Sequence, residues 1–140
     1  MTNPRDLFPV TQESVQGAYD LIFAPWVKQL GLCDFKIEPS RATARLPESD
    51  HLKLNGGGVC GQAMMAAIDT TAVLAVATGD QKIKGTAYQH TQFLRPASGD
   101  DLTVTAEVLR FGKSTAYVET RITFAGSGAL VAHAVLEFAF

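Results

Sequence analysis

The fold is decided by the stretch Asn55-Gly56-Gly57-Gly58-Val59-Cys60-Gly61-Gln62, which leads directly into an apolar segment ending at Ala77. Three consecutive glycines leave the backbone unshielded, and the following segment carries apolar residues on every side of a helix. A helix that is apolar all round is usually enclosed by the rest of its protein. The 15 residues from Ala63 to Ala77 include Asp69 and fall short of the about 20 apolar residues that cross a membrane. The sequence therefore predicts a buried helix over Gly61–Ala77.

Alternating apolar and polar residues predict strands downstream of this helix. The pattern repeats in four segments separated by short Gly-containing turns: Thr86–Leu94, Leu102–Leu109, Ala116–Phe124 and Leu130–Phe140. Turns of this length suit antiparallel hairpins.

Upstream of the central helix, two shorter strands are expected at Cys33–Glu38 and Arg41–Leu46. Before them, a helix that Thr11 can cap has one apolar face, formed by Val15, Ala18, Tyr19, Ile22 and Phe23. The whole order predicts an α+β fold, in which an antiparallel sheet wraps around one long central helix and an amphipathic helix precedes both.

Length and charge limit the classes of protein to which this chain can belong. The 140 residues fit one domain, residues 1–140, with a lead-in over residues 1–10. Charged residues make up 19%, less than usual, which hints at a buried interface between subunits. The net charge of −2 argues against a general nucleic-acid binder. Two cysteines and no signal-peptide pattern favour a reduced, cytoplasmic setting without membrane association.

The glycine stretch entering an apolar helix with one interior acid, Asp69-Thr70, resembles the hotdog-fold acyl-CoA thioesterases, and most closely their phenylacetate-degradation (PaaI-like) branch. The segment from Phe93 to Ala106 is similar to the next strand pair of that branch, and Gly112-Lys113-Ser114-Thr115 to its following hairpin. The resemblance covers roughly residues 30–140. It implies a hotdog fold, hydrolysis of an acyl-CoA thioester without a metal or redox cofactor, and a homodimer or homotetramer.

The helix entrance departs from the family pattern. The branch usually has His-Gly-Gly where this chain has Cys60-Gly61-Gln62, so a cysteine replaces a histidine that lies beside the thioester in the family. The loop is also one residue shorter between Asn55 and Cys60. Both changes bear on substrate choice and on rate.

Asp69 is the first candidate for catalysis, because a lone carboxylate on an apolar helix is costly to bury without a partner. From the residues alone, an Asp69 that faces solvent or hydrogen-bonds to Thr70 and Thr71 is an equal alternative. The resemblance favours a catalytic role, as general base on water or as nucleophile on the thioester carbonyl.

The glycine loop is the second candidate, because unshielded amides at a helix N-terminus favour an anion. The Gly61 amide is the leading donor to the oxyanion of a tetrahedral intermediate. Gly61 and Asp69 are eight residues apart, about 12 Å along one helix, so one carbonyl cannot reach both. If both act on one thioester, they come from different subunits, and the resembled family does pair such helices antiparallel across a dimer.

Other residues are candidates for substrate contacts. Asn55 can hold the thioester or the attacking water, or can simply be a turn residue. Thr70 can orient the acid or a water molecule. The remaining candidates for the pocket and for coenzyme A are Gly58, Cys60, Gln62, Arg95, Lys113, Ser114 and Thr115, of which the two cations can meet phosphates.

Three rival interpretations stay open. Cys60 at a helix N-terminus can be a nucleophile, although such a cysteine is more often a small buried residue. A hotdog hydratase or dehydratase needs a histidine beside the acid, and none accompanies the loop. A non-catalytic acyl-CoA-binding module would keep the pocket without turnover. His51, His90 and His133 are scattered, so no metal site is expected.

Overall fold

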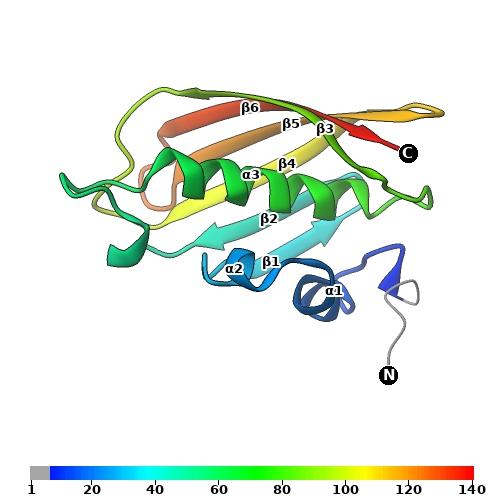
Figure 1. Cartoon of the computed structure of the whole chain (residues 1–140), viewed down its shortest axis with the longest axis horizontal. Helices are drawn as coiled ribbons and strands as arrows, with labels where there is room; N and C mark the ends of the chain where they lie inside the picture. The colour runs from blue at the N-terminus through cyan, green and yellow to red at the C-terminus, as the bar shows by residue number, and fades with distance from the viewer. Residues whose placement is uncertain (1–6) are drawn as a thin grey trace.

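The computed structural model describes residues 7–140. Within them, six strands form one antiparallel sheet in the order β1-β2-β4-β5-β6-β3. The strands are β1 (Cys33–Glu38), β2 (Arg41–Leu46), β3 (Gly85–Phe93), β4 (Leu102–Phe111), β5 (Thr115–Phe124) and β6 (Leu130–Ala139). The sheet curves around the long helix α3 (Gly61–Val76), as Figure 1 shows. The predicted α+β fold is confirmed, with each strand within a few residues of its expected bounds.

The N-terminal helix α1 (Val15–Ile22) buries Val15, Ala18 and Tyr19, as its spacing predicts. Its N-cap residue is Ser14, not Thr11. Thr11 nevertheless makes a capping bond, because its Oγ1 accepts from the Ser14 amide at 3.3 Å, while the Thr11 amide donates to Ser14 Oγ at 2.9 Å. A short helix, α2 (Pro25–Lys28), follows, and a 3-10 turn, η2 (Asp50–Leu52), precedes the glycine loop.

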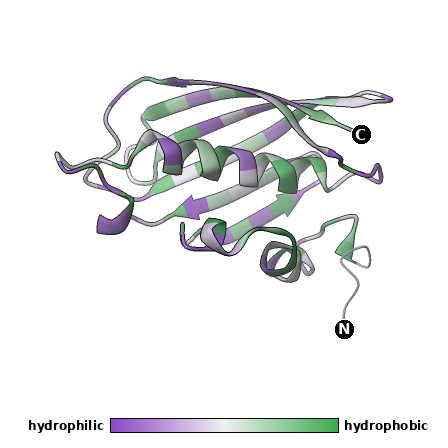
Figure 2. Ribbon diagram, in the orientation of Figure 1, coloured by the Kyte–Doolittle hydropathy of each residue, from purple (hydrophilic) through white to green (hydrophobic). Residues whose placement is uncertain are grey.

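The core lies between α3 and the concave face of the sheet. Ten of the 16 residues of α3 are buried, and the helix packs against β2, β4 and β5. The strands alternate between hydrophobic and hydrophilic residues along their length (Figure 2). The largest fully buried side chains include Phe138, Leu46, Ile68 and Leu74, each of which stabilises the fold by about 1.5–3 kcal/mol.

One face of α3 is not covered by the sheet. It carries Gln62, Met65, Ala66, Asp69 and Val73, which are exposed or half-buried and share one side of the helix at spacings of three and four residues. The sequence predicts that this helix is buried on every side, but only the side of α3 that faces the sheet is buried. Apart from Gln62 and Asp69, the residues on the open face are apolar.

Strand β3 forms one end of the sheet. Within the described residues β6 is the only strand that pairs with it, so its other edge has no partner strand there. Seven of its nine residues are exposed, including Tyr88 (53% exposed) and Phe93 (47% exposed). Long exposed edges with large apolar side chains are ready templates for pairing with another strand.

Candidate active site

Asp69 lies on the open face of α3 and is held by strand β3. The Thr86 hydroxyl donates a hydrogen bond of 2.6 Å to Asp69 Oδ1. Burial raises the pKa of the Asp69 carboxyl, and the hydrogen bond from Thr86 opposes this rise. A carboxylate whose pKa lies above its ordinary value is a better proton acceptor near neutral pH than an exposed aspartate. The open face of α3 therefore carries one oriented, partly buried carboxyl group.

An irregularity in β3 aims Thr86 at this acid. The pairing with β6 shifts between Thr86 and Tyr88, so the strand carries a β-bulge there. Beyond the bulge, Gln89 faces α3, since its amide nitrogen reaches the Met65 carbonyl at 3.4 Å. Thr86 and Gln89 are three residues apart and would face opposite sides of a regular strand. The bulge allows both to face the helix, a common use of bulges near functional sites.

The alternation of side chains along β3 also turns His90 away from Asp69. Gln89 faces α3, and one residue further on, His90 faces the opposite side of β3. His133 lies 3.8 Å from Glu119, and His51 contacts Ser49. Among residues 7–140, no histidine hydrogen-bonds to Asp69. A hydratase or dehydratase, which needs that pair, is not favoured by this arrangement.

The glycine loop brings the backbone to the N-terminus of α3. Gly57 and Gly58 have φ angles of +86° and +83°, which side-chain-bearing residues rarely adopt. The Leu54 amide donates to the Gly58 carbonyl and the Val59 amide to the Ala97 carbonyl, both at 2.9 Å. Asn55 lies at the exposed tip of this turn. The loop is thus folded back on itself and anchored to the segment that follows β3.

The first amide of α3 is available to a ligand. Cys60 is the N-cap residue and makes no side-chain cap hydrogen bond. Among the described residues, no group accepts a hydrogen bond from the Gly61 amide. The Phe93 ring lies close beside it, because a Cβ atom placed on Gly61 would be 3.3 Å from that ring. An unpaired N–H at a helix N-terminus suits an oxyanion.

The candidate residues for substrate contacts fall into two groups at opposite ends of α3. Gly58, Gly61 and Arg95 line one cavity of about 500 Å³ at the N-terminal end. Lys113, Ser114 and Thr115 belong to the β4–β5 hairpin, which is tied to the loop after α3 because Gln81 Nε2 donates to the Lys113 carbonyl at 3.1 Å. Asp69 lies between the two groups along the helix. One chain does not bring its acid, its glycine loop and its hairpin together.

Three candidates near the helix have different surroundings. Gln62 is exposed on the open face of α3, and Cys60 is half-buried at its entrance. The Thr70 side chain is buried in the core, 3% exposed. The hydrogen bond to Asp69, which the sequence suggests could come from Thr70, comes from Thr86 instead. Sequence reasoning missed Thr86, because a threonine at the start of a predicted strand is unremarkable and the bulge leaves no recognisable signal.

Residues 7–140 contain neither a metal-binding cluster nor a membrane-spanning helix. No group of three or more His, Cys, Asp or Glu side chains could hold a metal ion. None of the helices in that range is long and apolar enough to cross a membrane.

Comparison with known protein families supports the fold seen in the structure. The family model described as the thioesterase superfamily matches residues 56–130, which include the glycine loop, α3 and β3. No curated protein sequence matches the chain significantly.

Solved structures of similar fold come from bacteria and vertebrates. The conserved protein PA5202 of Pseudomonas aeruginosa is 25% identical with a TM-score of 0.76, over 86% of this chain and 96% of that one. The E. coli PaaI protein of the phenylacetic acid degradation operon is 22% identical with a TM-score of 0.74, over 81% and 86%. Zebra fish thioesterase superfamily member 2 is 18% identical with a TM-score of 0.83, over 93% and 98%. The fold around α3 is therefore the hotdog fold of the thioesterase superfamily.

Proposed function

The chain belongs to the thioesterase superfamily, and from that premise we propose that it hydrolyses an acyl-CoA thioester to the free acid and coenzyme A. The observation that carries this proposal is the oriented acid at Asp69, held by Thr86 on a face of α3 that the sheet leaves open. The structural similarity to E. coli PaaI, at 22% identity, supports the fold that this reaction would require.

The proposed reaction uses two protein groups and one water molecule. Asp69 takes a proton from water, whose oxygen attacks the thioester carbonyl and forms a tetrahedral oxyanion. The Gly61 amide donates a hydrogen bond to that oxyanion. The C–S bond then breaks, releasing the free acid, and the coenzyme A thiolate leaving group takes from Asp69 the proton that came from water. Direct attack by the Asp69 carboxylate, followed by hydrolysis of the anhydride, is a variant of the same scheme.

We place each site between two subunits. Gly61 and Asp69 lie about 12 Å apart along one helix, and the candidate residues divide between the two ends of α3. Two antiparallel α3 helices related by a two-fold axis would bring Asp69 of one chain to the glycine loop of the other. Such an axis presents the same patch twice, so a dimer would hold two identical sites.

Two features of the surface support such a dimer. The open face of α3 carries Met65, Ala66 and Val73, which would be buried against a second helix. The free edge of β3 is long and exposed, and pairing it with a second copy would satisfy its backbone groups. Both features lie on the side of the chain that holds Asp69 and Thr86.

Coenzyme A would then meet cations from both chains. Arg95 lies with Gly61 on the cavity at the N-terminal end of α3, and Lys113 lies at the other end with Ser114 and Thr115. An antiparallel pair places Arg95 of one chain nearer to Lys113 of the other. These side chains are our candidates for the phosphates.

The test is release of the coenzyme A thiol from a panel of aromatic and aliphatic acyl-CoA esters. We expect hydrolysis of at least one class, and Asp69→Asn should lower kcat by roughly a hundredfold or more. If the folded wild-type protein binds acyl-CoA but hydrolyses none of the panel, the chain is a binding module and the proposed activity is wrong. Normal turnover by Asp69→Asn would remove this residue from the mechanism.

A further inference from the structure

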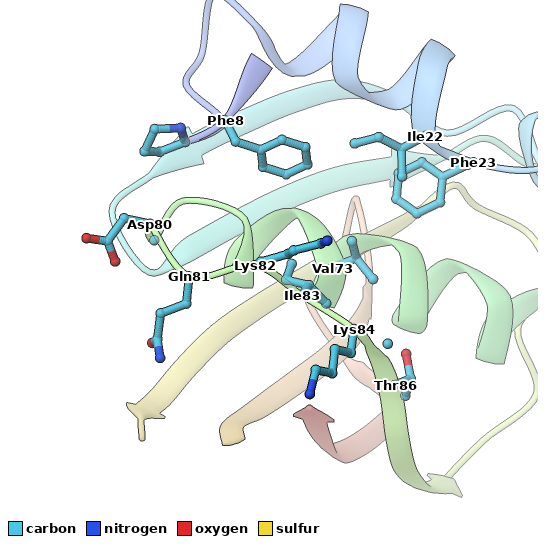
Figure 3. Close-up of a pocket in the computed structure, with 13 residues that line it drawn as sticks. Phe8, Ile22, Phe23, Val73, Asp80, Gln81, Lys82, Ile83, Lys84 and Thr86 are labelled. Carbon is cyan, nitrogen blue, oxygen red and sulfur yellow. The ribbon is translucent and has the colours of Figure 1, made fainter. Parts of the chain in front are cut away.

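A second cavity, of about 800 Å³, opens at the C-terminal end of α3. Its apolar wall comes from three parts of the chain: Phe8 before α1, Ile22 and Phe23 at the end of α1, and Val73 and Ile83 around the end of α3. Figure 3 shows these side chains facing one space. Phe8 and Ile22 remain 39% and 36% exposed. The size and lining are those of a small-molecule pocket.

The cavity extends to the residue that holds the candidate catalytic acid. Thr86, which donates the hydrogen bond to Asp69, also lines its wall. Val73 lies four residues after Asp69 on the same face of α3, about 6 Å further along the helix. A thioester carbonyl held at Asp69 can therefore extend its acyl group past Val73 into this space.

One charged side chain points into this apolar space. In Figure 3 the Lys82 ammonium lies below Phe8 and Ile22 and beside Val73, whereas Lys84 points away from the cavity. The Asp80 carboxylate, the one acid on the lining, also points outward. Within residues 7–140, Lys82 has neither an ion-pair partner nor a hydrogen-bond acceptor. Lys82 is an exposed residue, and its ammonium can pair with an anion that enters the cavity beside these apolar side chains.

We propose that this cavity binds the acyl group and that Lys82 makes it selective for acyl groups that carry a carboxylate at the far end of an apolar chain. The proposal rests on the thioesterase activity proposed above and names its substrate class. The apolar wall takes the chain, and the Lys82 ammonium pairs with the terminal carboxylate. An acyl group without the carboxylate fits the same wall but leaves Lys82 without a partner.

The first test compares two substrates of equal chain length, octanoyl-CoA and suberyl-CoA. Wild-type protein should show a kcat/KM about two- to fivefold higher for suberyl-CoA, the gain expected from one ion pair to an exposed lysine. Lys82→Met should lose this preference by lowering kcat/KM for suberyl-CoA while leaving octanoyl-CoA unchanged or improved. Lys84→Met removes the same charge two residues away and should keep the preference. Equal preference in wild type and Lys82→Met, with hydrolysis intact, would overturn the role of Lys82 and leave the thioesterase activity standing.

The second test does not depend on turnover. Calorimetric titration with free suberate and free octanoate should give tighter binding of suberate to wild type and to Lys84→Met, but not to Lys82→Met. If Lys82→Met instead weakens binding of coenzyme A alone and leaves suberate unaffected, Lys82 serves the phosphates and the proposal is wrong. If the panel shows no hydrolysis at all, this titration still decides whether the cavity selects a carboxylate.

Discussion

The Thr86 hydroxyl lies 2.6 Å from Asp69 Oδ1 and joins the edge strand to the central helix at the acid itself. As a donor, it favours the ionised carboxylate and fixes its orientation. Burial acts in the opposite direction and has the larger effect, so the pKa of Asp69 remains above its ordinary value. The hydrogen bond therefore orients the Asp69 carboxyl and offsets part of the rise in its pKa.

Thr86→Val keeps the shape of the side chain and removes the donor. Without that hydrogen bond the pKa of Asp69 rises further, so the acidic limb of the kcat/KM profile should move to higher pH. A hydrogen bond to a charged group contributes about 1.5–3 kcal/mol, so we expect about a tenfold loss of kcat/KM at neutral pH. The measurement is the pH dependence of acyl-CoA hydrolysis.

Two variants serve as controls for this experiment. Thr86→Ser restores the hydroxyl and should return the acidic limb toward its wild-type position. Thr91→Val makes the same change on the same strand, where the hydroxyl donates to Gln89 rather than to the acid, and should not shift the limb. An unshifted limb in Thr86→Val would show that the acid works without this donor.

Asp69→Asn should separate activity from stability. In the folded protein the pKa of Asp69 is raised, so the folded state holds its proton more tightly than the unfolded state. Its contribution to stability is therefore greatest below the ordinary aspartate pKa of about 3.9 and falls as the pH rises through the folded-state pKa. Asparagine does not titrate and can still accept from Thr86. We expect the inactive variant to melt at the same or a higher temperature than wild type at pH 7, with the gap narrowing in acid. A clearly lower Tm at pH 7 would contradict this.

Much of the fold could be predicted because each helix and strand is marked by a pattern within its own stretch of sequence. Strands β1 and β2 match the expected ranges, Cys33–Glu38 and Arg41–Leu46, since strict alternation marks a sheet with one buried face. The predicted helix Gly61–Ala77 exceeds α3 by a single residue, its C-cap Ala77. Glycines before that helix and short turns between the later strands are enough to order the elements.

The partner of the acid could not be predicted in the same way. Thr86 faces α3 only because the β3–β6 pairing slips by one residue, and such a slip depends on contacts distant in sequence. Thr70 is adjacent to Asp69 in the chain, but neighbouring residues on a helix point about 100° apart, and this places Thr70 in the core. The cavity beside Lys82 could not be predicted from the sequence either, because Phe8, Val73 and Lys82 come together only in the folded chain.

Cys60→Ser tests the role of the thiol. Cys60 has the extended backbone of an N-cap, with φ −68° and ψ 151°, and makes no cap hydrogen bond. Serine is a preferred N-cap and can accept from the amides of the first turn, which contributes about 0.5–2 kcal/mol. We expect an unchanged or higher Tm and only a small change in kcat. A loss comparable to that of Asp69→Asn would mean that the thiol takes part in the chemistry.

The shared site is tested by mixing two damaged chains. Asp69→Asn lacks the base, and Gly61→Pro lacks the proposed oxyanion donor. Proline is tolerated as the first residue of a helix, and the extended backbone of Cys60 suits a residue before proline. Each homodimer should be nearly inactive. A mixed dimer should regain one intact site, formed by Asp69 of one chain and Gly61 of the other, so refolded equimolar mixtures should recover up to about a quarter of wild-type activity, because half the dimers are mixed and each carries one of two sites.

Gly61→Ala is the matched control for the proline variant. It adds the same Cβ atom, 3.3 Å from the Phe93 ring, but keeps the amide N–H. If crowding against Phe93 caused the loss, alanine would inactivate the protein as proline does; if the amide matters, alanine should keep most of the activity. Size-exclusion chromatography and circular dichroism must show that both parent chains fold and associate. Mixed dimers that form from such parents and remain inactive would place Asp69 and Gly61 in separate sites.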